Sequence, residues 1–203
     1  MNKLSLILLL SCALSLKSYA QELSYPRFTY GVEWSYISTL HSTWHYNFFS
    51  PEGYRMNTRG SETMYRSNGE AYVNAGYNFD ENWNLSLYIG LTGLNDLHKA
   101  VPVTLRGTYY FGCNPLSDRW FSYMEAGSGI SLKLPPQEIF ACKAGGGYRI
   151  SLSRNTKIDF MLAVKVTYTH PDIFYDQVKI DFNKINKNGM ALTSIALGMG
   201  VRF

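Results

Sequence analysis

Apolar and polar residues alternate along most of the chain, and the last fifteen residues show the pattern most clearly. Successive side chains of a β-strand point to opposite faces, so an alternation of period two predicts a strand with two different faces. One face of this C-terminal segment is apolar, and the other is small or polar. The apolar face carries Ala191, Thr193, Ile195, Leu197, Met199, Val201 and Phe203.

The same alternation recurs in seven earlier segments, each about as long as a tilted strand that crosses a bilayer. The least regular is 120–132, where Phe121 and Tyr123 share a face with Glu125. With the C-terminal segment they predict an all-β fold of eight antiparallel, up-and-down strands. The seven segments are 28–36, 71–79, 83–91, 101–111, 120–132, 140–152 and 157–170.

The polarity of the two faces distinguishes between kinds of barrel. A soluble lipocalin-type barrel turns charged residues outward and lines its cavity with apolar ones. Here every charged residue of the strands lies opposite the apolar face, so the outer solvent must be lipid. Backbone groups in lipid must all be paired, which closes the sheet into a transmembrane β-barrel. The inward charges are Glu33, Glu70, Arg106, Glu125, Lys143, Arg149, Lys157, Asp159, Lys165 and Arg202.

The connections between these segments fall into two alternating classes. The segments 80–82, 112–119 and 153–156 are short, whereas 38–69, 92–100, 133–139 and 169–189 are mostly longer. Transmembrane barrels have short periplasmic turns and longer extracellular loops. An even number of strands then places both termini in the periplasm. Aromatic residues near the short turns predict a girdle at that interface: Tyr77, Phe79, Trp83, Tyr109, Phe111, Trp120 and Phe203.

The first twenty residues have the composition of a cleaved export signal. Lys3 precedes an apolar run, and Ser18-Tyr19-Ala20 is a small-x-small cleavage pattern, so residues 1–20 are expected to be removed and residues 21–203 to form one barrel domain. Leu9-Leu10-Ser11-Cys12 also resembles a lipoprotein box, and lipidation of Cys12 stays open as the alternative. No later apolar run reaches the length of a membrane-spanning helix.

Charge and cysteine content exclude further classes of protein. Removal of residues 1–20 leaves 17 basic and 15 acidic residues, without the concentrated basic excess of a nucleic-acid-binding protein. Cys113 and Cys142 remain, and their predicted positions toward opposite ends of the barrel indicate two free thiols rather than a disulfide.

The terminal sequence Gly198-Met199-Gly200-Val201-Arg202-Phe203, the eight alternating strands and the leader together resemble the small eight-stranded outer-membrane β-barrel proteins, the porin-like barrels of the OmpA, OmpX and OmpW type. In that family a C-terminal Phe is the assembly signal, which the resemblance assigns to Phe203. It implies location in a Gram-negative outer membrane. The implied partners are membrane lipid, lipopolysaccharide and the outer-membrane assembly machinery.

An eight-stranded barrel is narrow enough for its own side chains to fill, so no wide diffusion pore is expected. Buried charges need partners, and the inward charges are therefore expected to form a structural network. The strand order suggests Arg106 with Glu125, Glu125 with Lys143, and Arg149 with Asp159. The network is predicted to comprise Glu33, Arg106, Glu125, Lys143, Arg149, Asp159 and Lys165.

The predicted loop 38–69 is unusually rich in aromatic residues and arginine, the residue types that protein surfaces use for binding. We expect either a recognition surface for an unknown extracellular ligand, or a lid that packs on the barrel rim and contacts lipopolysaccharide phosphates through arginine. The candidate binding residues are Trp44, Tyr46, Arg55, Arg59 and Arg66, with Phe48, Phe49, Tyr54 and Tyr65 beside them.

The four histidines bear on the alternative of an enzyme. His41, His45 and His98 are predicted in loops, and His170 at a strand end. His41-x-x-x-His45 has metal-ligand spacing only on a helix, so neither metal nor cofactor is expected.

Some small outer-membrane barrels are lipid A acylases or deacylases with a His, a Ser and an acidic residue at the outer rim. Thr169-His170-Pro171 and Ser42-Thr43 supply polar groups there, but no catalytic set can be assembled, and lipid A modification remains the alternative to a structural or surface-binding role.

Overall fold

The computed structural model describes residues 26–95, 98–132, 136–153 and 155–203. The predicted leader, the cleavage site after Ala20 and the alternative lipidation of Cys12 lie outside these residues. The strands are β1 (Phe28–Phe49), β2 (Arg55–Asn78), β3 (Trp83–Asn95), β4 (His98–Tyr110), β5 (Arg119–Ser131), β6 (Glu138–Ser151), β7 (Lys157–Thr169), β8 (Phe174–Tyr175), β9 (Val178–Lys179) and β10 (Ile185–Arg202), with the 3₁₀ helix η1 (Phe182–Lys184) between the last two.

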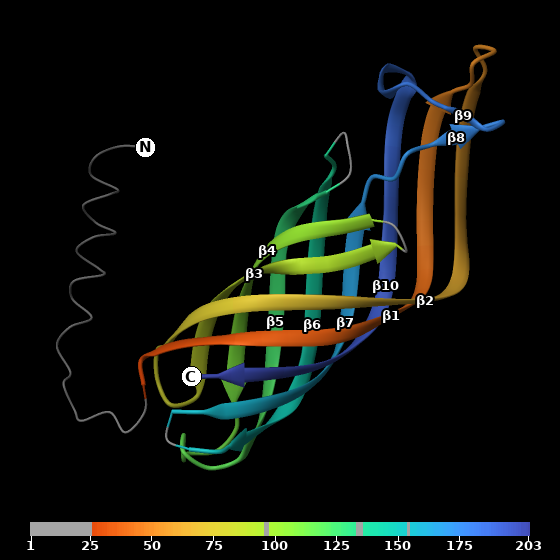
Figure 1. Ribbon diagram of the computed structural model, residues 1–203. Coiled ribbons are helices and arrows are strands. Elements are labelled where there is room, and N and C mark those ends of the chain that lie inside the picture. Colours follow the sequence, from red (N-terminus) through yellow and green to blue (C-terminus); the bar gives the residue numbers. More distant parts are fainter. Residues whose placement is uncertain (1–25, 96–97, 133–135, 154) are drawn as a thin grey trace, which may run out of the picture.

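Eight of these strands close into one antiparallel barrel in the order β1-β10-β7-β6-β5-β4-β3-β2, and Figure 1 shows its inclined axis. The first and last long strands form the closing seam. The C-terminal residue extends that seam, because Phe203 donates its backbone N–H to the Tyr30 carbonyl at 2.8 Å and accepts the Tyr30 N–H at 3.1 Å. The expected eight-stranded up-and-down barrel is thus confirmed.

The two ends of the barrel differ in their connections. At one end, which we call the turn end, β2–β3, β4–β5 and β6–β7 are joined by short segments, and both Phe28 and Phe203 lie there. Aromatic rings pack against one another around this end: Trp83 lies 5.0 Å from Tyr109 and Trp120 lies 4.9 Å from Tyr148, measured between ring centroids. This arrangement matches the interfacial girdle expected from the sequence.

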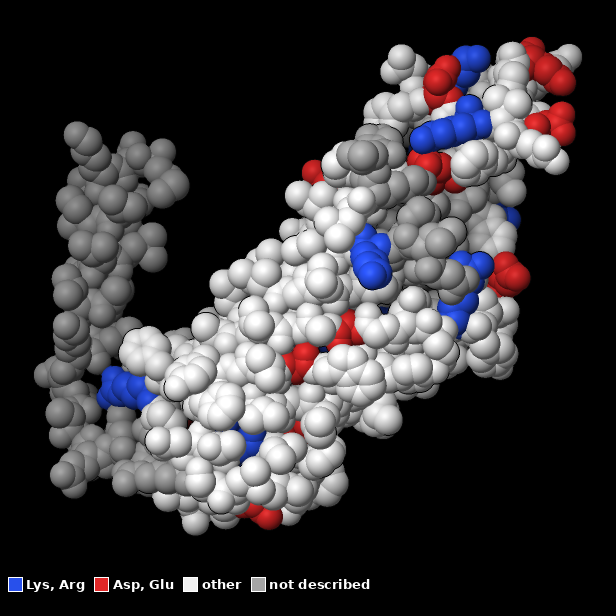
Figure 2. Space-filling view, in the orientation of Figure 1, with Lys and Arg blue, Asp and Glu red and all other residues white. Residues whose placement is uncertain are grey.

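The outer wall and the interior of the barrel have opposite polarity. Apolar side chains of every long strand are exposed on the wall, whereas Glu33, Arg106 and Asp159 are buried inside. In the described residues of the barrel strands, outward charged residues occur only at or beyond the rim opposite the turn end. At this rim, Lys99 and Glu138 lie beside Ala100 and Ile139, which point inward. On the face that Figure 2 shows, the wall is accordingly mostly free of charge, and charged atoms gather at that far end.

The prediction that residues 38–69 form a long loop is wrong. β1 and β2 have 22 and 24 residues, compared with 13 or 14 in β3 to β7, and continue as a regular hairpin beyond the rim. The register between β1 and its neighbours shifts between Thr39 and His41, which moves the inward side chains from odd to even positions. The alternation is interrupted there, and outside the bilayer no lipid enforces an apolar face, so the sequence pattern resembled a loop.

The other long connections also contain more strand than expected. β3 extends to Asn95 and β4 begins at His98 within 92–100, and β10 begins at Ile185 within 169–189. Beyond the rim, β10, β1 and β2 form a three-stranded sheet in which His41 pairs with Thr193 and Thr63. We call this extension the distal sheet; it comprises residues 41–49, 55–63 and 185–193.

Within the residues that the structure describes, no helix is long and apolar enough to cross a membrane. Cys113 and Cys142 are free, as expected, and both are exposed.

Candidate functional site

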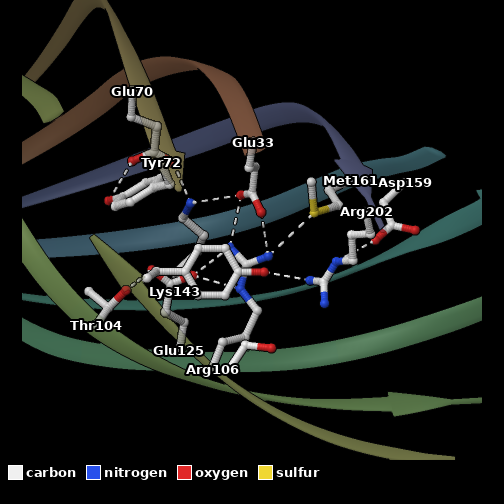
Figure 3. Close-up of polar contacts among 12 residues, drawn as sticks. Glu33, Glu70, Tyr72, Thr104, Arg106, Glu125, Lys143, Asp159, Met161 and Arg202 are labelled. Atoms are coloured by element: carbon white, nitrogen blue, oxygen red, sulfur yellow. Dashed lines mark hydrogen bonds and ion pairs between the residues drawn. The ribbon is translucent and has the colours of Figure 1, made fainter. Parts of the chain in front are cut away.

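Arg106 is the centre of the charged barrel interior. Its guanidinium pairs with Glu33 on one side and Glu125 on the other, each at 2.6 Å, and is completely buried. The guanidinium carbon lies 4.0 Å from the ring centroid of Tyr88 and 4.3 Å from that of Tyr123, so aromatic faces stabilise the charge above and below. Figure 3 shows the resulting network of polar contacts across the lumen.

Glu70 is the second centre of the charged interior. The sequence analysis placed it among the inward charges but did not include it in the predicted network. Its carboxylate binds the ammonium of Lys143 and, at 2.6 Å, that of Lys165. Lys143 is paired in register with Glu125, and its ammonium also lies 3.9 Å from Glu33. The two lysines come from β6 and β7 and Glu70 from β2, so these ion pairs also cross the lumen.

A third group of charges lies toward the turn end. Arg149 donates two hydrogen bonds to Asp159, at 2.6 and 2.7 Å, in the bidentate geometry that gives strong ion pairs. Arg202 reaches the same carboxylate at 2.9 Å through Nε. The hydroxyl of Tyr88 accepts a hydrogen bond from Arg202 and thereby joins this group to the centre of the network.

These side chains close the lumen. Arg106 and Tyr88 have no exposed surface, and Glu70 and Asp159 are also buried, as expected for a filled eight-stranded barrel. Buried charges are costly to desolvate, and here each is held by partners on a neighbouring strand or on the opposite wall. The interior is therefore suited to stabilising the barrel and not to passing solutes of appreciable size.

The outward-facing surface of the distal sheet is basic. Arg59 donates to His45 at 3.1 Å and Arg55 donates to Asn47 at 3.2 Å, across the β1–β2 pairing. Lys187 of β10 pairs with Asn47 in register and so lies on the same surface. The register places no acidic residue of these three strand segments on this surface. We call it the basic face, and its residues are His41, Thr43, His45, Asn47, Phe49, Arg55, Asn57, Arg59, Ser61, Thr63, Lys187, Gly189, Ala191 and Thr193.

The opposite surface of the distal sheet is apolar and covered. Phe48 is buried with Ile173 and Ile180 of the segment that follows β7, and Tyr46 and Met56 pack against this cluster. Burial raises the pKa of the Tyr46 phenol. The β8–β9 hairpin that supplies this cover lies against the distal sheet in Figure 1.

The candidate binding residues from the sequence are consequently divided between two surfaces. Trp44 and Tyr46 face the covered side, since they pair in register with Gly60 and Thr58. Arg55 and Arg59 lie on the basic face. Arg66 pairs with Thr39, whose side chain is buried, so it points toward the barrel mouth.

Lys187 is a member of the basic face that sequence reasoning missed, and Arg119 is an interior cation that was assigned to a turn. Both lie in segments interpreted as connections, 169–189 and 112–119. The direction in which the side chains of Lys187 and Arg119 point becomes clear only from the observed extent of β10 and β5.

The histidines whose side chains the structure describes, His41, His45 and His170, form no catalytic set with the other described residues. His41 and His45 lie in β1 and His98 begins β4, so the prediction of loop positions for these three is wrong. His170 follows β7, and its Nδ1 lies 3.5 Å from the backbone oxygen of Glu138. No cluster of three or more metal-ligating side chains occurs in the part of the chain that the structure describes.

A groove of about 620 Å³ on the outer wall groups residue types relevant to lipid chemistry, with His170, Glu138, Ser128 and Tyr168 in its lining. Ser128 is on β5 and pairs with Phe140 of β6, which in turn pairs with Tyr168 of β7. Two strand spacings of roughly 4.8 Å therefore separate Ser128 from the strand that leads to His170. A nucleophile and its base need hydrogen-bond contact, and this spacing does not supply it.

No family model and no curated protein matches the chain. Among solved structures, Neisserial surface protein A is similar with a TM-score of 0.51 at 11% identity, over 86% of this chain and 95% of that one. The outer membrane protein OprG from Pseudomonas aeruginosa gives a TM-score of 0.51 at 12% identity, over 90% of this chain and 99% of that one. At these identities the similarity establishes the fold.

Proposed function

We propose that this chain, which has the fold of the small eight-stranded outer-membrane β-barrels, resides in the outer membrane and recognises anionic saccharides through its basic face. The observation that carries the proposal is the distal sheet. Three strands continue beyond the rim, and the nine residues from His41 to Phe49 extend roughly 30 Å along the strand direction. A filled barrel explains stability, but it does not require this extension.

The chemistry of the basic face indicates the class of ligand. Arg55, Arg59 and Lys187 present their charges without an acidic neighbour on the same surface. Arginine donates planar pairs of hydrogen bonds that suit phosphate and sulfate groups. The hydrogen bonds from Arg59 to His45 and from Arg55 to Asn47 hold both guanidiniums against the sheet and lower the entropy lost on binding. Phosphate groups of lipopolysaccharide and sulfated or phosphorylated polysaccharides outside the cell share this chemistry.

The test is a binding measurement on the membrane-inserted protein. The double variant Arg55→Gln, Arg59→Gln is compared with the wild type for binding to dextran sulfate and to vesicles with and without lipopolysaccharide. The matched control is Lys179→Gln, Lys184→Gln, which removes two exposed cations from β9 and η1. We expect at least a tenfold loss in affinity for the first variant, and little change for the control.

Loss of binding to lipopolysaccharide vesicles alone would identify the cell's own lipid as the ligand, and loss for dextran sulfate alone would indicate an external polyanion. Equal binding by all three proteins would overturn the proposal.

A lipid A-modifying enzyme remains the alternative, and the groove lined by His170 and Glu138 is the observation that favours it. Mass spectrometry of lipid A from cells with the wild-type protein and with His170→Ala distinguishes the two functions. A change in lipid A acylation that requires His170 would establish the enzyme.

A further inference from the structure

His45 lies on the basic face, in the middle strand of the distal sheet. In register it pairs with Arg59 of β2 on one side and with Gly189 of β10 on the other. Its Nε2 lies 3.1 Å from Nε of Arg59 and 3.0 Å from Oδ1 of Asn57. A single ring nitrogen therefore has a donor and an acceptor within hydrogen-bond distance.

The two contacts of His45 require opposite states of this nitrogen. The Nε–H of Arg59 donates only to a nitrogen with a free lone pair, which Nε2 has in the neutral ring whose proton is on Nδ1. Oδ1 of Asn57 accepts only from an N–H, and Nε2 always carries one in the protonated ring. Only one of the two contacts is a hydrogen bond in any one state. Protonation of His45 therefore exchanges Arg59 for Asn57 as its partner.

The charged neighbours of His45 on this surface are cations. Glu62 of β2 pairs with Ser42, which is buried, so it faces the opposite surface of the sheet. Glu52 lies in the turn beyond the end of β1, and the segment that covers the distal sheet packs on the opposite surface. A protonated His45 therefore increases the positive charge of the basic face. The other side chains of this face that carry or can take up a positive charge are His41, Arg55, Arg59 and Lys187.

We propose that His45 is a positioning residue for Arg59 and that its protonation strengthens the recognition of anionic saccharides at acidic pH. This inference rests on the function proposed above. In the neutral state, His45 occupies the Nε–H of Arg59. In the protonated state, His45 donates to Asn57, frees the Nε–H of Arg59 for the ligand and adds a cation beside it. Histidine is the side chain whose charge commonly changes between about pH 5 and 8.

The direction of the effect follows from the contact between the two side chains. An imidazolium and a guanidinium in contact repel each other, and a sulfate or phosphate group that binds both removes this repulsion. The hydrogen bond between Arg59 and His45 is exposed, so its loss costs little by comparison. Proton binding and anion binding therefore strengthen each other by the same factor. For exposed groups this coupling is modest, about fivefold in affinity.

The test measures the binding of dextran sulfate to the membrane-inserted protein at about pH 8 and about pH 5.5, at constant ionic strength. Sulfate groups stay ionised at both values, so only the protein changes its charge. The affinity of the wild type should rise about fivefold at the lower pH. His45→Gln can still accept from Arg59 but cannot take up a proton, and its affinity should change less than about twofold. His41→Gln, which removes the other histidine of the basic face, is the matched control and should keep most of the rise.

A second measurement needs no ligand. The nitrogen-15 resonance of Arg59 Nε should shift over this pH range in the wild type and stay in place in His45→Gln. Arg55 is the internal reference, because its Nε donates to Asn47, which does not titrate. An Arg59 resonance that does not move in the wild type, or an equal rise in affinity in His45→Gln, would overturn the proposal. Absence of dextran sulfate binding at both pH values would instead refute the function proposed above, and the Arg59 resonance would still decide the role of His45.

Discussion

Arg106 and Glu33 form an ion pair across the lumen of the barrel: Nη1 of Arg106 lies 2.6 Å from Oε2 of Glu33, although β4 and β1 are separated in the sheet by β2 and β3. This ion pair therefore depends on closure of the barrel and not on the register between two adjacent strands. Each buried partner satisfies the other, and neither can reach water.

Arg106→Met should strongly destabilise the barrel. The substitution removes from the buried carboxylates of Glu33 and Glu125 the cation that lies nearest to them, and the loss of one partner from a buried ion pair costs about 3–5 kcal/mol. The measurement is urea unfolding of the protein refolded in lipid vesicles. Arg55→Met, which removes an exposed cation from the distal sheet, should change the free energy of unfolding by no more than about 0.5 kcal/mol. Equal stability of the two variants would contradict a structural role for the network.

Leu87→Arg should impair membrane insertion. Leu87 is exposed on the wall in the middle of β3, between Ala75 and Leu105, and an arginine at the bilayer midplane of a barrel costs about 2–4 kcal/mol. Leu116→Arg places the same residue in an exposed turn at the end of the barrel and serves as the control. The measurement is electrophoretic mobility in SDS with and without boiling, since closed barrels resist SDS until heated. A boiling-dependent shift retained in full by Leu87→Arg would argue against lipid contact at this wall.

The two exposed thiols should differ in their access to water. Cys113 lies in the turn between β4 and β5, whereas Cys142 lies on the outer wall in β6. In proteoliposomes, a charged maleimide should label Cys113 and spare Cys142, because lipid covers the second thiol. Addition of detergent should expose both, and the single variants Cys113→Ser and Cys142→Ser assign the labels. Rapid labelling of Cys142 in intact vesicles would refute its placement against lipid.

Gly60→Val should loosen the distal sheet without opening the barrel. A Cβ at this position would lie 2.4 Å from Cζ2 of Trp44, so the indole must move. Gly107→Val is the control, because no atom lies within 4 Å of a Cβ added there. Limited proteolysis should cleave the first variant faster beyond the rim, while both keep the boiling-dependent mobility shift. A cleavage rate equal to that of the control would show that Trp44 is not fixed by its contact with Gly60.

The sequence by itself determined the architecture of the barrel wall. Lipid outside and a filled interior impose opposite polarities on alternate residues, and this contrast is visible in segments such as 157–170 and 191–203. The inward charges were identifiable for the same reason. Ion pairs between adjacent strands could also be predicted, because strands that follow one another along the chain are neighbours in an up-and-down barrel. The pair of Arg149 and Asp159 is one of them.

Only the tertiary structure decided which charges meet across the lumen, because closure of the sheet brings Glu33 to Arg106 and Glu70 to Lys165 from strands that are not neighbours. It also decided the form of the segment 38–69. Beyond the rim no lipid enforces an apolar face, and the shift after Thr39 reverses the inward positions, so local sequence carried no continuous signal for the distal sheet. Pairing with β10 and cover by Ile173 and Ile180 supply the stabilisation that the local pattern does not show.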